Sequence, residues 1–164
     1  MSKIKSSKVA VFLNASTSST ANWARMGKGI TSLPISYGAK TTTECYVNED
    51  NATTTVDGYE IGIDTEQTAI KGDAIFDYVD GIRKSLKTGS ECETEALLVN
   101  IYDLSEGTGG VVSGTAQKFG ATVAITDFEL NGGEIAKIKY KVSLNGDPSN
   151  VTASISSAGV LTVS

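Results

Sequence analysis

The chain of 164 residues has an ordinary globular composition, with 40% apolar and 20% charged residues, which excludes intrinsic disorder. Its net charge of −5 lacks the positive footprint on which nucleic-acid binding depends. No apolar run approaches the roughly 20 residues that cross a bilayer, and the first apolar run is too short for the core of a secretion signal. We therefore expect a protein kept in a cytosol, without membrane association.

The length of the chain fits one domain over residues 1–164, large enough to bury a core without disulfides or metal. Within this domain we expect flexible loops at about 14–29, 48–57 and 104–114, where polar residues and glycines gather. Cys45 and Cys92 are far apart and match no metal-ligand spacing. In a reducing compartment they are expected to be free thiols, one or both of them buried, and a disulfide is the alternative.

The first part of the chain predicts one strand followed by a long polar loop. Residues 8–13 include an apolar run with the length of a strand. Residues 14–28 are rich in Ser and Thr and contain Trp23 and Arg25, and a loop of this length usually has a function. Trp23 either anchors the loop on its own core or contacts another subunit, and the residues alone leave both readings open.

A two-residue alternation begins at Tyr59 and predicts a strand with one face in the core. The other face is acidic and carries Glu60, Asp64 and Glu66. A later run, residues 134–144, alternates in the same way. The polar side chains of that run are Lys137, Lys139 and Lys141. The acidic face is either ordinary solvated surface, paired across strands with these lysines, or a surface with a function.

Residues 73–87 predict the one convincing amphipathic helix of the chain. Asp73 is placed as its N-cap, and Gly89 as the left-handed residue that ends it. Its apolar stripe has helical spacing and consists of Ile75, Val79, Ile82 and Leu86. Because a single stripe needs a sheet to lie on, we expect these side chains to face the subunit core and the helix to be a structural brace.

The rest of the chain predicts strands joined by tight turns. Asn131-Gly132-Gly133 is the strongest hairpin signal, and a second turn is expected at 145–148. The expected strands are residues 95–103, 121–130, 134–144, 151–155 and 160–163. Together with the earlier strands, they predict a mainly β fold with one α-helix.

The residue types required for catalysis are scarce. The chain has no histidine, which removes the usual general base and the usual metal ligand. The motifs G-x-S-x-G and H-E-x-x-H and the phosphate-binding loop are also absent. We therefore expect a protein that is not an enzyme and that needs no cofactor or metal.

The order and spacing of several short motifs resemble the major tail tube protein of long-tailed bacteriophages, especially the siphophages and prophages of Gram-positive hosts. The resemblance covers about residues 8–149 and rests on the segments Trp23–Gly29, Ile35–Lys40, Cys45–Asp50, Gly72–Asp80, Leu98–Tyr102 and Asn145–Pro148. It implies a β-sandwich or barrel-like fold in which strands of neighbouring subunits join edge to edge around a lumen. Subunits would form hexameric rings that stack into a hollow tube in the virion tail, assembled in the host bacterial cytoplasm.

The resemblance also implies partners and surfaces. The partners would be copies of the same chain, a tape-measure protein, tail-tip and terminator proteins, and double-stranded DNA that passes through without specific binding during ejection. Glu60, Asp64 and Glu66 would line the lumen, where negative charge avoids gripping phosphates. The expected contacts between subunits involve Trp23, Arg25, Glu49 and Asp50. The alternatives are a tube of a contractile tail or tailocin, or a non-catalytic β-sandwich binding module such as an adhesin or carbohydrate-binding domain.

Overall fold

The computed structural model describes residues 1–164 as a mainly β protein with one α-helix, which confirms the predicted fold class. The helix α1 spans Ala74–Ser85, and short 3-10 turns lie at residues 6–8, 89–92, 101–103 and 108–110. The strands are β1 (Val9–Asn14), β2 (Trp23–Arg25), β3 (Ile35–Ser36), β4 (Lys40–Glu44), β5 (Thr53–Gly58), β6 (Ile61–Thr68), β7 (Glu93–Asn100), β8 (Ser105–Glu106), β9 (Val112–Glu129), β10 (Lys137–Ile155) and β11 (Leu161–Val163).

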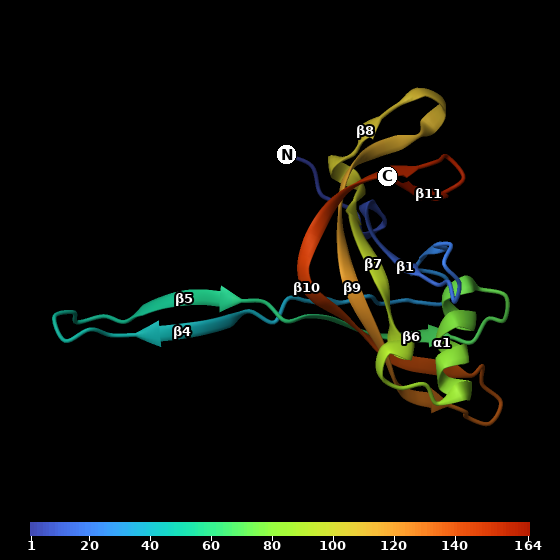
Figure 1. Cartoon of the computed structure of the whole chain (residues 1–164), viewed down its shortest axis with the longest axis horizontal. Coiled ribbons are helices and arrows are strands. Elements are labelled where there is room, and N and C mark those ends of the chain that lie inside the picture. The colour runs from blue at the N-terminus through green and yellow to red at the C-terminus, as the bar shows by residue number, and fades with distance from the viewer.

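Most strands belong to one antiparallel sheet in the order β2-β1-β7-β9-β10-β6-β3, with β8 added to β9 and β11 to β10. The sheet is open, and its strongly curved long strands β9 and β10 run through the whole body (Figure 1). The predicted hairpin around Asn131-Gly132-Gly133 joins these two strands, and the strands predicted at 151–155 and 160–163 are the end of β10 and β11, which pair with each other. The single helix is too short to cross a membrane.

The turn predicted at 145–148 is wrong. Asn145 still pairs with Gly120 of β9, Gly146–Pro148 form an irregularity inside β10, and pairing with β9 resumes at Ser149 opposite Lys118. Gly146 adopts a left-handed conformation there, with φ of 70°. Turn-forming residues produce a bend here and not a chain reversal, because β9 continues as a pairing partner on both sides of the irregularity. The two ends of this one long strand therefore contribute to different cores of the protein.

Each face of the sheet carries its own core, and the smaller of the two covers only part of its face. The larger core lies between α1 and the sheet, and includes Val11, Leu13, Ile63, Phe119, Val123, Ile138, Tyr140 and Val142. The smaller core lies on the opposite face and consists of Ala10, Phe12, Leu97, Val99, Ala116, Ala153, Ile155 and Leu161. Successive residues of β1 and β7 alternate between these cores, which explains why both strands are apolar throughout.

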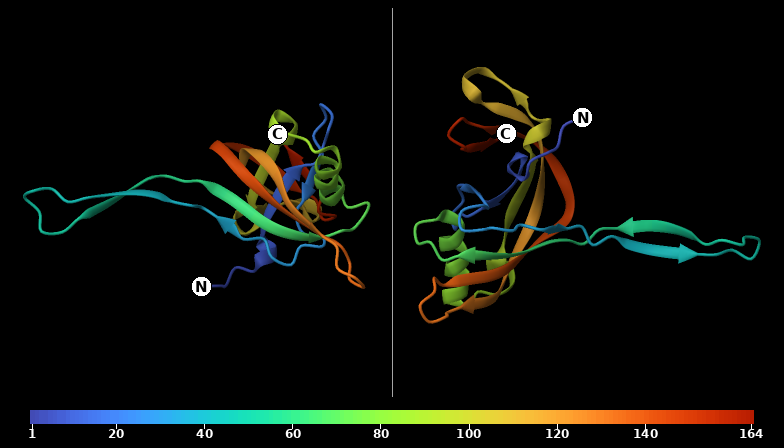
Figure 2. Two further views of the ribbon diagram at one scale, coloured as in Figure 1. Left: turned by 90° about the horizontal axis from the view of Figure 1, so that it is seen from below. Right: turned by 180° about the vertical axis from the view of Figure 1, so that it is seen from behind.

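Helix α1 covers the larger core (Figure 2) and begins as predicted. The Asp73 carboxylate accepts a hydrogen bond from the Phe76 amide at 3.0 Å, as expected of an N-cap. Three members of the predicted stripe are buried, namely Ile75, Val79 and Ile82, and Phe76 joins them.

The prediction was wrong for the end of the helix. Leu86 is 83% exposed and adopts the left-handed conformation, with φ of 48°, directly after Ser85. The chain leaves the helix there, so Leu86 no longer lies on the apolar stripe. Gly89 also has positive φ but lies three residues beyond the helical cap, and therefore does not end the helix as predicted.

Strands β4 and β5 form a separate two-stranded hairpin, here called the arm, that projects away from the body in every view (Figures 1 and 2). Every residue from Ser36 to Asp57 is exposed. The expected loop at 48–57 therefore contains strand β5, because its β-branched residues Thr53–Val56 pair with Lys40–Glu44. The expected loops at 14–29 and 104–114 likewise contain strands β2 and β8.

Candidate assembly surfaces

Where the smaller core does not cover it, the face of the sheet opposite α1 carries charged residues of β6, β7, β9 and β10, and this part is here called the polar sheet face. Register places Lys139 opposite Glu66, and Lys141 opposite Asp64. The charged residues of this face are Asp64, Glu66, Glu93, Glu95, Lys118, Asp127, Glu129, Lys137, Lys139 and Lys141. Their side chains are exposed or half-buried, so the face remains in contact with solvent.

Ion pairs connect charged side chains of neighbouring strands on this face. Lys137 lies 2.9 Å from Glu66, and Lys139 lies 2.5 Å from Glu129 and 3.6 Å from Glu66. The hydrogen bond from Lys137 lowers the pKa of Glu66, and the bond to Glu66 raises the pKa of Lys137. Lys118 and Glu95 form a further pair at 2.9 Å. The predicted cross-strand pairing of acids with lysines is therefore present for Glu66.

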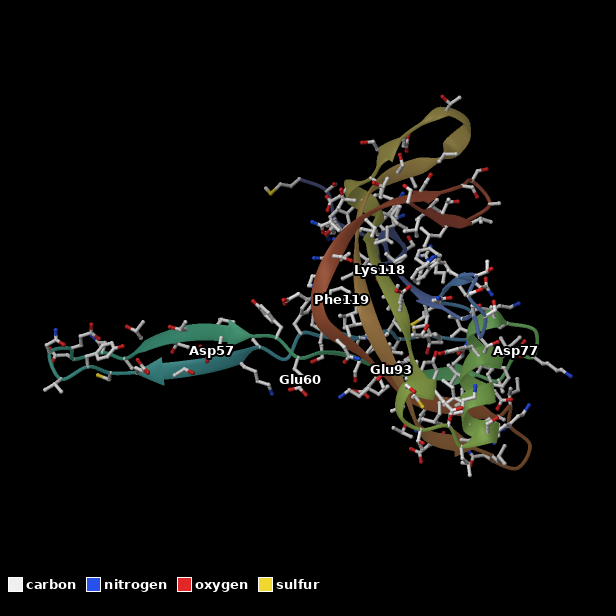
Figure 3. The ribbon with its side chains drawn as sticks, in the orientation of Figure 1. Asp57, Glu60, Asp77, Glu93, Lys118 and Phe119 are labelled. Carbon is white, nitrogen blue, oxygen red and sulfur yellow. The ribbon has the colours of Figure 1, made fainter.

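The other two predicted lumen residues have different surroundings. Glu60 lies where the arm meets the body (Figure 3), and its carboxylate is 2.7 Å from the Lys40 ammonium, whose hydrogen bond lowers the pKa of Glu60. Asp64 forms no ion pair, although it lies opposite Lys141. The Lys141 side chain instead extends over Gly62, whose lack of a Cβ leaves room for it. Asp64 is thus the carboxylate of the predicted set whose charge stays uncompensated.

The arm is a second candidate surface, because an isolated two-stranded hairpin is at best marginally stable in water. Its strands are joined by side-chain hydrogen bonds from Thr43 to Thr54, at 2.9 Å, and from Thr42 to Asp57. Its tip exposes Tyr46 and Val47 beside acidic residues. A ribbon that buries neither face within its own subunit is suited to being covered by another molecule.

Trp23 and Arg25, the other predicted contact residues, lie on β2 in the body. Trp23 is half-buried and packs against the smaller core, which agrees with the anchor reading. The Arg25 guanidinium donates to the Ser7 carbonyl at 3.0 Å. Glu49 and Asp50 lie instead at the tip of the arm, so the chain does not bring the four residues together by itself.

Arg25 also borders a cavity of about 590 Å³, here called the N-terminal groove. The apolar part of its lining comes from strand β1 and from the segment that leads to β3. The lining residues of that part are Val9, Val11, Met26, Ile30, Leu33 and Ile35. Sequence reasoning found neither this groove nor the arm, although the β-branched runs on both sides of Asn48–Asn51 were a signal for a hairpin.

The fold has a relative among solved structures. Neither a protein-family model nor a curated protein matches the sequence. The chain is similar to a chain in the tail of an empty GTA particle computed with helical refinement in C6 symmetry, with a TM-score of 0.61 and 12% sequence identity. The alignment covers 90% of this chain and 98% of that chain. The two chains therefore share one fold over nearly their whole length.

Proposed function

We propose that this protein is the structural subunit of a phage-like tail tube, and that its copies form hexameric rings stacked into a hollow conduit for DNA. The observation that carries the proposal is the shared fold with a chain of a C6-symmetric GTA tail over 90% of the sequence. The finer assignment, to long-tailed siphophages of Gram-positive hosts, rests on the sequence motifs described above. A contractile tail or tailocin tube remains the alternative within the same class.

The uncovered arm supports self-assembly. A hairpin without any covering layer gains stability when another subunit buries it, and a contact that repeats around a closed ring leaves no arm uncovered. Two of the larger cavities belong to these surfaces, one being the N-terminal groove and the other lying at the root of the arm. Cavities on these surfaces are consistent with a subunit that binds its own copies.

We further propose that the polar sheet face lines the lumen, with Glu60, Asp64 and Glu66 in its wall. This face lies opposite the helix and keeps its charges in solvent. Its carboxylates outnumber its lysines, and the lysines near Glu66 are engaged in ion pairs. A wall in which carboxylates are in excess, and in which Lys141 is the one lysine outside an ion pair, would repel phosphates weakly and would not retard the passage of DNA.

Electron microscopy of the concentrated full-length protein tests the proposal. We expect rings or hollow tubes, with six-fold symmetry in averaged end views. A matched variant with residues 41–56 replaced by a short Gly-Ser turn keeps both cores and should stay monomeric. Wild-type protein that remains monomeric at every concentration and salt tested would contradict the proposed function. Tubes in which Asp64 lies on the outer wall would contradict the lumen assignment alone.

A further inference from the structure

The tip of the arm combines two exposed apolar side chains with unbalanced negative charge. Tyr46 is 58% exposed, and Val47 is fully exposed. The charged residues of the tip are all acidic, namely Glu44, Glu49 and Asp50. The Tyr46 hydroxyl donates to the Glu44 carboxylate at 2.7 Å, and a backbone bond from Glu49 to Tyr46 closes the turn. The tip is therefore an ordered, acidic knob with an apolar centre.

The N-terminal groove has the complementary character. Arg25 is the only charged residue in its lining, and the remainder is apolar or neutral. The segment that precedes β1 contributes Ser6 to the lining and carries Lys3, Lys5 and Lys8, all of them exposed. The groove thus offers apolar surface under a rim of positive charge, which suits an acidic knob with an apolar centre.

The arm cannot reach this groove in its own subunit, because it projects away from the body in every view (Figures 1 and 2). We propose that the arm tip of one copy docks in the N-terminal groove of a second copy, with Tyr46 and Val47 on the apolar lining and Glu49 and Asp50 facing Arg25. This inference rests on the proposed self-assembly, and it specifies which two surfaces of the subunit meet.

Two other cavities compete for the tip and fit it less well. The cavity at the root of the arm, about 690 Å³, is lined by Tyr37, Tyr59 and Phe119, but its charged lining residue is Asp147, which repels an acidic knob. The cavity beside the end of α1, about 720 Å³, is lined by Arg83 and Lys87, but also by Glu93, whose carboxylate would repel an acidic knob. The Arg83 guanidinium is already engaged with Asp80 at 2.7 Å and lies over the Phe128 ring.

Disulfide trapping tests the pairing, because the exposed Cys45 lies at the arm tip. In a Cys92→Ser background, Thr31→Cys places a thiol in the N-terminal groove. The matched controls are Gln117→Cys in the root cavity and Thr88→Cys in the cavity beside α1. After mild oxidation of assembled protein, we expect a ladder of covalent multimers only with Thr31→Cys. A ladder with either control alone, or equal ladders with all three, would overturn the proposal.

Charge reversal provides a second, independent readout. The double variant Glu49→Lys with Asp50→Lys should raise the protein concentration needed for assembly at least tenfold, and Arg25→Glu added to it should recover part of that loss. Unchanged assembly of the double variant would overturn the pairing. If wild-type tubes form without a Thr31→Cys ladder, this inference fails and the proposed function stands. If wild-type protein forms neither rings nor tubes, both fail.

Discussion

The Tyr140 hydroxyl donates a hydrogen bond to the Gln67 carboxamide oxygen at 3.0 Å, and both side chains are completely buried between α1 and the sheet. The Gln67 amide group then donates to the Asp73 carboxylate at 2.8 Å and to the Lys28 carbonyl at 3.0 Å. One glutamine therefore joins strand β10, the N-cap of α1 and the segment beside the N-terminal groove. Buried polar side chains of this kind are costly to leave unpaired.

We predict that Gln67→Leu destabilises the fold by about 1–3 kcal/mol, because it leaves the Tyr140 hydroxyl and the Lys28 carbonyl without their partner. Urea unfolding monitored by circular dichroism measures the change. Gln117→Leu is the matched control, because that glutamine is exposed and should change stability by less than about 0.5 kcal/mol. Equal stability of the two variants would show that the buried network contributes nothing.

Tyr140 also predicts a loss of stability at alkaline pH. Burial, with a smaller effect of the Asp73 charge, raises the pKa of Tyr140 well above its ordinary value of 10.0. The folded state therefore keeps the phenol proton while the unfolded state releases it, so this contribution is fully present below about pH 10 and declines as the pH rises above it. The decline of the urea midpoint above about pH 10 should be shallower in Tyr140→Phe. An identical decline would mean that other groups cause it.

Two apolar residues of the predicted helix stripe, Val79 and Leu86, differ sharply in burial, and substitutions at them should differ in their effect on stability. Val79→Asp places a carboxylate in the larger core, where the native side chain is fully buried, and should abolish folding. Leu86→Asp changes an exposed residue in the left-handed conformation, which Asp adopts more readily than Leu, and should leave the unfolding free energy unchanged or slightly higher. Soluble expression and thermal unfolding of the two variants measure this difference. A folded Val79→Asp protein would show that the stripe is not part of the core.

The ion pairs of the polar sheet face predict a modest loss of stability in acid. Because Lys137 lowers the pKa of Glu66 below its ordinary value of 4.5, the contribution of this carboxylate is present above about pH 4.5 and is lost as the pH falls through the lowered value. The side chains of this pair are partly exposed, so salt should weaken the effect. Comparing urea midpoints between about pH 7 and pH 3 in wild type and Glu66→Gln measures it. A fall of the same size in both would assign the acid sensitivity elsewhere.

Local patterns predicted the regular elements well where one face was apolar. The stripe of Ile75, Val79 and Ile82, the Asp73 cap and the alternation of β6 all follow from side chains whose burial repeats with the period of the backbone. Leu86 fits the same period but lies beyond the cap, and periodicity alone does not show where a helix ends. The Asn145–Pro148 segment has the residues of a turn, and it forms a bend because β10 pairs with β9 on both sides of Gly146–Pro148.

Long-range arrangement could not be predicted from the residues. The arm has no apolar face, so no pattern of burial distinguished it from a loop. The N-terminal groove brings together β1, Arg25 and the segment before β3, which are separated along the chain and meet only in the folded sheet. Whether Glu60, Asp64 and Glu66 face a lumen depends on the arrangement of several copies, and that stays a prediction.

The unsupported arm makes the free subunit vulnerable to proteases. Extended chain exposed over the whole stretch Ser36–Asp57 fits a protease cleft with little local unfolding, whereas the two cores protect the rest of the chain. Assembly would bury this stretch, whereas in unassembled subunits it would stay accessible to cleavage. Limited proteolysis of the arm therefore distinguishes assembled from unassembled protein, and in the cell the same difference would remove surplus subunits first.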